Sequence, residues 1–181
     1  MTIQRLIKGC RKHDRKCQKE LYLRYCQKAM NISMRYVQDI HLAKDVVQSA
    51  FIQVFTKIDL FDWKKGSFDN WLSRIVINEA LQVVRQNKRI LFQEMEALQP
   101  EKVEPPIVLD QLLAADIIKL VEQLPEGYRL VFLLSVVEGY KHQEIGEKLG
   151  ISPSTSRSQL TRSKQLLRKL ILNQNSSAHA S

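Results

Sequence analysis

Glycine and proline are scarce in this sequence, with six and five residues among 181, which argues against a turn-rich all-β fold. The three cysteines, Cys10, Cys17 and Cys26, lie in one predicted helical stretch, with no CxxC pair and no zinc-like spacing to a histidine. We therefore expect free thiols packed in a helix, and no metal site.

The sequence also has no apolar run near the roughly 18 residues that a transmembrane helix needs, and no apolar N-terminal segment typical of a signal peptide. Paired carboxylates, a nucleophile with an adjacent base, and a glycine-rich phosphate loop are missing as well. These absences predict a cytoplasmic protein without membrane insertion, without enzymatic activity, and without a cofactor or a small-molecule substrate.

Positive charge is in excess and unevenly distributed. The 28 Lys and Arg against 19 Asp and Glu give a formal net charge of +9, typical of a protein that binds nucleic acid or an anionic membrane. Basic and acidic residues number 18 and 8 over residues 1–93, 2 and 7 over 94–124, and 8 and 4 over 125–181. The acidic middle segment contains Pro100, Pro105 and Pro106, so we interpret it as a flexible linker between two basic blocks.

Apolar residues recur at helical spacing through nearly the whole chain, and no segment alternates as a strand does. The pattern predicts helices over residues 42–58, from Ser67 to about Arg89, over 107–124, and over 126–138 with Gly139 as the stop. The fold class we expect is therefore all-α.

The charge blocks and the helical periods together predict the domain organisation. The expected parts are a helical domain over residues 1–93, a linker with the start of a helix over 94–119, a helix-turn-helix domain over 120–172, and a disordered tail over 173–181.

The helix predicted from Ser67 has a cationic face. Its apolar residues share one arc, and the opposite arc holds Arg74, Asn78, Arg85 and Arg89, with Lys88 beside them and Trp71 projecting toward them. Such a ladder of cations can follow a phosphate backbone. A solvated basic face without a ligand is the other interpretation of the same pattern.

A helix-turn-helix is predicted near the C-terminus. A helix over residues 141–150 ends at Gly150, and Ser152 followed by Pro153 is a strong start signal for the next helix. Gly146, in the middle of the first helix, indicates that the second helix approaches closely. The second helix exposes hydroxyls, an amide and an arginine that suit base edges in a major groove, although a hairpin without a DNA role is the alternative.

Several short segments, specific as an ordered set, carry a family resemblance. They are KDVVQSAF over residues 44–51, FDNWLSRIVIN over 68–78, LPEGYR over 124–129, EIG over 144–146 and GISPST over 150–155. On these residues the chain resembles a bacterial RNA polymerase sigma factor of the sigma-seventy superfamily, in its extracytoplasmic-function (ECF) subgroup. The likeness covers about residues 20–92 and 120–172.

The resemblance implies a transcription initiation factor that binds the β′ and β subunits of core RNA polymerase, directs the enzyme to specific promoters and assists promoter melting. Many members of the subgroup also bind an anti-sigma factor, which adds such a protein to the candidate partners. A homodimeric helix-turn-helix regulator that acts without core polymerase is the alternative. That alternative leaves the basic helix without a role, and likewise the aromatic and basic residues just before it, which are Phe61, Trp63, Lys64 and Lys65.

The resemblance also assigns roles to residues. Those matching the docking surface for the β′ coiled coil are Asp45, Gln48 and Phe51; Phe51 also lies in the apolar stripe, so a core position is its alternative. The segment Asp59–Phe68 matches the loop that captures a flipped base of the minus-ten element. The minus-ten contacts implied are Phe61, Trp63, Lys64, Lys65, Trp71, Arg74, Asn78, Arg85, Lys88 and Arg89. The minus-thirty-five contacts implied are Ser152, Ser154, Thr155, Arg157, Ser158, Gln159 and Arg162.

Overall fold

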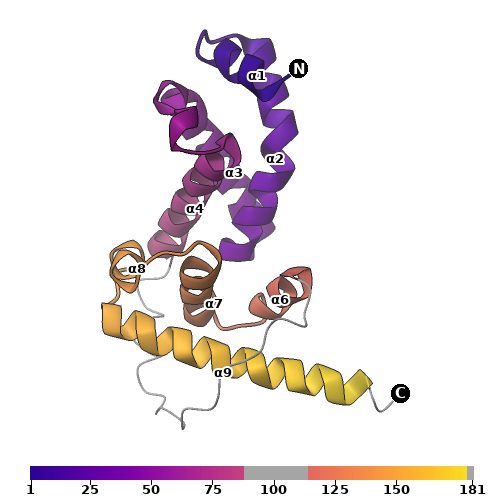
Figure 1. Cartoon of the computed structure of the whole chain (residues 1–181), viewed down its shortest axis with the longest axis vertical. Coiled ribbons are helices and arrows are strands. Elements are labelled where there is room, and N and C mark those ends of the chain that lie inside the picture. Colours follow the sequence, from indigo (N-terminus) through magenta and orange to yellow (C-terminus); the bar gives the residue numbers. More distant parts are fainter. Residues whose placement is uncertain (88–113, 179–181) are drawn as a thin grey trace. The chain divides into compact units, whose positions relative to one another are not determined.

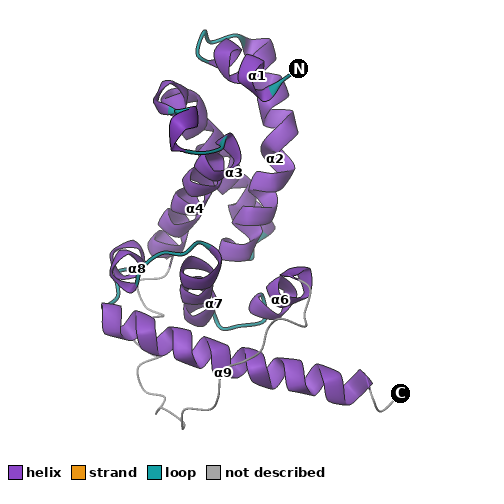
Figure 2. Cartoon of the chain, viewed as in Figure 1, coloured by secondary structure: helices purple, strands orange, loops and turns teal. Residues whose placement is uncertain are grey.

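The computed structural model describes residues 1–87 and 114–178, and every regular element in these two stretches is a helix (Figure 1, Figure 2). The expected all-α fold is confirmed. The chain divides into an N-terminal unit, Met1–Asn87, and a C-terminal unit, Lys88–Ser181. Most of the linker predicted over residues 94–119 lies outside the described residues; a helix begins at Ala114.

The N-terminal unit is built from α1 (Ile3–Cys10), α2 (Arg15–Val37), α3 (Ile40–Lys57) and α4 (Phe68–Asn87). Two single turns of 3-10 helix, η1 (Ile58–Leu60) and η2 (Trp63–Lys65), connect α3 to α4. The carboxylates of Asp14 and Asp39 cap α2 and α3 by accepting hydrogen bonds from first-turn amides. Figure 1 shows α2, α3 and α4 side by side, and each of them packs against the other two.

The apolar face of α4 is broader than the sequence predicts. Phe68, Leu72, Val76 and Ala80 are buried as expected. The residues Ile75 and Val83, expected on the same arc, are half-buried, whereas the buried set also includes Ile77, Leu81 and Val84. Because α4 packs against both α2 and α3, its buried arc extends toward two partners rather than one.

The prediction of one helical stretch around the cysteines is wrong. Residues 11–14 form a turn between α1 and α2, in which His13 has a positive φ of 56° and Asp14 caps the next helix. Cys10 and Cys17 are buried on either side of this turn, and Cys26 is half-buried farther along α2. A carbon added at Gly9 would lie 2.2 Å from the Cys17 Sγ, so glycine permits this close packing of the two helices.

The C-terminal unit contains α6 (Ala114–Val121), α7 (Glu126–Phe132), the π-helical turn η5 (Leu133–Val137), α8 (His142–Leu149) and α9 (Pro153–Ala178). The helix predicted over 126–138 is therefore an α-helix followed by a π turn that ends at Val137; Glu138 caps it, and Gly139 follows with φ +75°. Residues 107–113 of the helix predicted over 107–124 lie outside the described part of the chain.

The last helix is longer than expected. The sequence predicts an end near Leu170 and a disordered tail over 173–181, but α9 continues to Ala178, and only residues 179–181 lie beyond the described backbone. Among the described helices, none combines the length and the apolar character that a bilayer crossing requires.

Candidate nucleic-acid and polymerase interfaces

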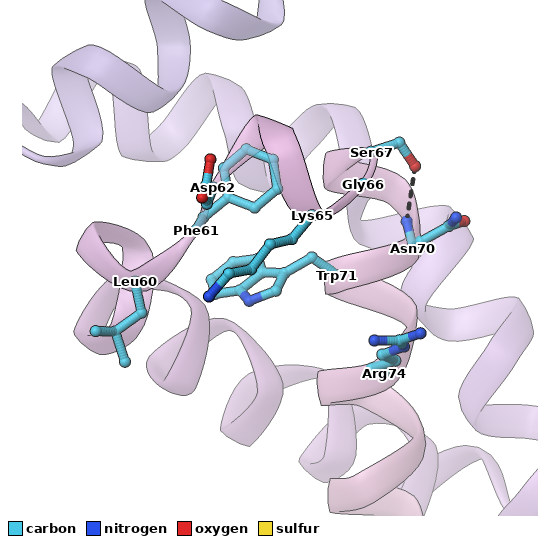
Figure 3. Close-up of a pocket in the computed structure, with 9 residues that line it drawn as sticks. All are labelled: Leu60, Phe61, Asp62, Lys65, Gly66, Ser67, Asn70, Trp71 and Arg74. Carbon is cyan, nitrogen blue, oxygen red and sulfur yellow. Dashed lines mark hydrogen bonds between the residues drawn. The ribbon is translucent and has the colours of Figure 1, made fainter.

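A hollow of about 190 Å³ lies where the loop formed by η1 and η2 meets the start of α4. Its lining combines aromatic, apolar, cationic and amide side chains; it consists of Leu60, Phe61, Asp62, Lys65, Gly66, Ser67, Asn70, Trp71 and Arg74. Trp71 lies at the centre of this set, with Leu60 and Arg74 on opposite sides of it (Figure 3). The hollow thus offers an aromatic face beside positive charge, the combination that binds single-stranded nucleic acid.

Phe61 is the hub of an aromatic cluster beneath the loop. Its ring centroid lies 4.8 Å from that of Trp63, 5.4 Å from Trp71 and 5.5 Å from Phe68. Phe61 is only 3% exposed and yet lines the hollow, so the ring supports the hollow, and its contact with minus-ten DNA stays a prediction. Trp63 is 42% exposed, and half-buried Trp71 lines the hollow itself.

The backbone of the loop is shaped by local hydrogen bonds. The Asp62 Oδ1 accepts from the Lys64 amide at 2.9 Å, and the Ser67 Oγ accepts from the Asn70 amide at 3.2 Å, drawn as a dashed line in Figure 3. Gly66 has φ +140°, which side chains rarely permit. The sequence indicates the loop as a segment and Ser67 as a helix start, but it does not indicate Leu60, Asp62 or Asn70 individually; the signal for these three is their place in or near that segment.

The cationic face of α4 is open. Arg74, Asn78 and Arg85 are exposed, and in the described part of the chain no carboxylate lies within ion-pair distance of either arginine. The nearby Asp69 is instead paired with Lys28 of α2. Lys64 and Lys65 of the loop are exposed beside this face, whereas Lys88 and Arg89 lie outside the described residues.

On α3, the expected docking residues separate into two groups. Asp45 and Gln48 are exposed, as a docking surface requires. Phe51 is 3% exposed and packs edge-on against Tyr22, with ring centroids 4.8 Å apart, so the prediction that it contacts polymerase directly is corrected. Its alternative, a core position, holds because Phe51 continues the stripe of Val47 and Val54 into the unit's interior.

The turn of the helix-turn-helix is formed as the sequence predicts. Gly150 adopts the left-handed conformation that ends α8, and the Ser152 Oγ caps α9 by accepting from the Thr155 amide at 3.0 Å. A carbon added at Gly146 would lie 2.7 Å from the Ile151 carbonyl oxygen, so the close approach inferred from this glycine is real and involves the turn backbone.

Most of the predicted contact residues on α9 face outward, and one does not. Ser152, Ser154, Arg157 and Ser158 are exposed, and Thr155 and Arg162 are half-buried. Gln159 is 3% exposed and shares the buried arc of Ser156 and Ser163, so the prediction that it reads a base is corrected. The arc is wider than expected because α9 packs against α7 as well as α8.

These features define a two-part DNA-binding protein, with a cationic helix and an aromatic hollow in one unit and a helix-turn-helix in the other. Comparison with known families agrees with this class. The family model for Sigma-70 region 2 matches residues 21–90, and the one for Sigma-70, region 4 matches residues 114–167.

Similar proteins span most of the chain. The ECF RNA polymerase sigma factor SigE of Mycolicibacterium smegmatis is 32% identical over 157 residues, which cover 82% of this chain and 59% of that protein. The ECF RNA polymerase sigma factor SigW of Bacillus subtilis is 29% identical over 181 residues, covering 93% of this chain and 96% of that protein. Among solved structures, CnrH in complex with the cytosolic domain of CnrY has a TM-score of 0.48 and 20% identity, covering 92% of this chain and 94% of that chain.

The chain therefore belongs to the sigma-70 family of RNA polymerase sigma factors. Within that family it is an extracytoplasmic-function sigma factor, as the resemblance in the sequence implies. Its class is that of transcription initiation factors, and the findings support this function rather than that of a homodimeric regulator.

Proposed function

We propose that this chain recruits core RNA polymerase through α3, holds the melted minus-ten element on α4 and its adjoining loop, and reads the minus-thirty-five element with α9. The observation that carries the proposal is the hollow beside Trp71, because the exposed cations Lys65 and Arg74 belong to its lining. An aromatic hollow bordered by cations is suited to one unstacked base and the phosphates that flank it.

Docking on polymerase is assigned to Asp45 and Gln48. These side chains lie one helical turn apart on the exposed side of α3, where both can meet the β′ coiled coil. The buried Phe51 supports this surface from below through its contact with Tyr22, which is itself 41% exposed beside it. The proposed partners also include the β subunit of core polymerase.

Melting is assigned to the loop and α4. Unstacking a base costs a few kcal/mol, and a hollow that accepts the base offsets this cost only when the strand is open. Binding through Trp71, Lys65 and Arg74 therefore stabilises the open duplex relative to the closed one. Trp63, Lys64, Asn78 and Arg85 extend the surface on either side, and Lys88 and Arg89 continue it in the sequence.

Minus-thirty-five recognition is assigned to the exposed side of α9. The hydroxyls of Ser152, Ser154 and Thr155 gather at its first turn, where hydroxyl groups can donate to phosphate. Arg157, Ser158 and Arg162 follow within reach of base edges and backbone. Two modest binding modules on one chain gain affinity together when both promoter elements are correctly spaced.

The chain is proposed to have no catalytic activity of its own, since the polymerase performs nucleotide addition, and to act in the cytoplasm beside polymerase and DNA. An anti-sigma factor that covers one of these surfaces is the proposed regulator. The test is a titration of the chain against core polymerase, followed by mapping of transcript start sites with and without the chain. Specific starts that need the chain support the proposal, whereas operator binding by a dimer without polymerase contradicts it.

A further inference from the structure

Arg11 connects the turn after α1 to the loop that lines the hollow. Its Nη2 donates to the Phe61 carbonyl oxygen at 2.6 Å, and its Nε lies 3.4 Å from the Ile58 carbonyl oxygen. Its Nε also lies 3.9 Å from the Asp59 Oδ1. These contacts span about 50 residues of sequence and hold both ends of the short η1 turn.

The other hydrogen bonds of this loop are local. Within residues 58–66 of the described chain, the Phe61 amide donates to Ile58, the Lys65 amide to Asp62 and the Gly66 amide to Trp63. Among the described residues, the loop is fixed to other elements by the burial of Ile58, by the ring contacts of Phe61 with Phe68 and Trp71, and by the guanidinium of Arg11, which alone holds its backbone carbonyls. Phe61 and its neighbours Leu60 and Asp62 all line the hollow, so holding the Phe61 carbonyl holds one wall.

We propose that Arg11 is a positioning residue for base capture: it holds the hollow in its open form before DNA arrives. The inference rests on the proposed function, in which the hollow accepts an unstacked base. A guanidinium suits this task because its donors are fixed in a planar fork that can serve two carbonyl oxygens at once. A preformed hollow binds more tightly than one that must be ordered during binding.

The hydrogen bonds of its guanidinium distinguish Arg11 from the lysines around it. Lys12, the next residue, is equally cationic and exposed, and none of the described residues forms an ion pair with it. If the turn contacted phosphate, either Arg11 or Lys12 could make the contact. The hydrogen bonds to the Ile58 and Phe61 carbonyl oxygens come from Arg11 alone. Lys12→Ala is therefore the matched control for Arg11→Ala, and Arg11→Lys keeps the charge while removing the fork.

The first experiment needs no DNA. The chain has two tryptophans, Trp63 and Trp71, and both belong to the cluster around Phe61, so intrinsic fluorescence reports on this loop. We expect acrylamide quenching of the full chain to rise roughly twofold in Arg11→Ala and Arg11→Lys and to stay unchanged in Lys12→Ala, because a loosened loop exposes its rings. Equal quenching in all four proteins, with unchanged circular dichroism, overturns the proposal.

The second experiment measures base capture in the complex with core polymerase. Wild-type complex selects single-stranded DNA from a randomised pool, and each position of the selected strand is then made abasic in turn. The position with the largest loss of affinity marks the captured base. We expect Arg11→Ala and Arg11→Lys to weaken binding of the intact strand roughly tenfold and to leave binding of the strand abasic at that position unchanged. Lys12→Ala should keep the wild-type ratio between the two strands.

The outcomes separate the inference from the proposed function. If the wild type loses no affinity at any abasic position, the hollow does not take a base, and the proposed function fails together with the role of Arg11. If the wild type shows the loss but Arg11→Ala weakens both strands equally, Arg11 contacts phosphate or merely supports the fold, and only the positioning role fails. Full rescue by Arg11→Lys overturns the role in the same way, because charge alone would then suffice.

Discussion

The His142 Nδ1 lies 2.9 Å from the Ser156 Oγ, and this hydrogen bond joins the two helices of the helix-turn-helix. Ser156 is fully buried on α9, and His142 is the first residue of α8. The bond therefore fixes the start of α8 against the first turns of α9, where the hydroxyls of Ser154 and Thr155 lie. It explains why a polar residue occupies a core position in the recognition helix.

Replacing His142 by alanine should destabilise the C-terminal unit by about 1 kcal/mol, because the buried Ser156 hydroxyl then loses its cross-helix partner. Denaturant unfolding of the full chain, followed by circular dichroism, measures the change. Gln143→Ala removes an exposed neighbour on the same helix and should be neutral. Equal stability of the two variants would show that the hydrogen bond contributes nothing.

Gly146→Ala should lower the stability of the C-terminal unit, whereas the same substitution inside an ordinary helix raises stability. Glycine to alanine inside a helix usually stabilises by about 1 kcal/mol. Here the new carbon would lie 2.7 Å from the Ile151 carbonyl oxygen, which is turn backbone, so we expect destabilisation of about 1–3 kcal/mol. Both the melting temperature and the affinity for minus-thirty-five duplex should fall. A rise in melting temperature would show that the turn backbone does not restrict this position.

Gln159→Leu should leave promoter reading intact and stabilise the fold. The Gln159 Oε1 is buried without a hydrogen-bond partner among the described residues, and an unsatisfied buried polar group costs about 1–3 kcal/mol. Leucine removes that group at similar volume. Loss of duplex binding in Gln159→Leu with unchanged stability would restore its base-reading role.

Arg162→Ala, on the outward-facing side, should instead weaken minus-thirty-five binding without loss of core binding.

The Cys10 thiol should be inert at neutral pH. Burial, together with the nearby Cys17 and Asp14, raises the pKa of Cys10 from 9.0 to about 11. Because the raised pKa favours the neutral thiol in the folded state, its stabilising contribution is complete below pH 9 and is lost as the pH rises toward 11. We expect iodoacetamide to modify the half-buried Cys26 first, and Cys10→Ala to flatten the alkaline fall in stability. Modification of Cys10 as fast as Cys26 would contradict this.

The helix-turn-helix could be predicted from the sequence because its signals act on neighbouring residues. These signals are Gly146, Gly150, and Ser152 before Pro153. The elements that prediction missed depend on distant partners. Residues 11–14, which form the break after α1, contain no glycine or proline; Gly9 lies just before the break, and His13 adopts the positive φ within it. Gln159 is buried because α9 packs against α7 and α8, with α6 also in contact, and the apolar period of α9 alone does not reveal these partners.

In the candidate site, too, local patterns could be predicted from the sequence, whereas features that depend on distant partners could not. The aromatic and basic residues of the loop and the cationic face of α4 were readable as a pattern, since their types and spacing carry the chemistry. The hollow itself was not, because Leu60 and Asn70 come from different elements and meet only in the fold. Phe51 and Phe61 have the residue types of a contact surface, yet packing against Tyr22 and Trp71 places both inside.

The central claim is that the open face of α4 holds the melted promoter strand. Arg74→Ala should lower the dependence of single-strand affinity on salt by about 0.7 in the log–log slope, since one phosphate contact is lost. Lys57→Ala, an exposed cation at the end of α3, is the control and should leave the slope unchanged.

The most direct measurement is permanganate reactivity of promoter thymines in the complex of core polymerase with the Arg74→Glu, Arg85→Glu double variant. Wild-type complex should make thymines of the minus-ten element reactive, because they are unpaired. The double variant should bind core polymerase normally and leave those thymines protected. Full reactivity with the double variant would contradict the claim that this helix face stabilises the opened DNA.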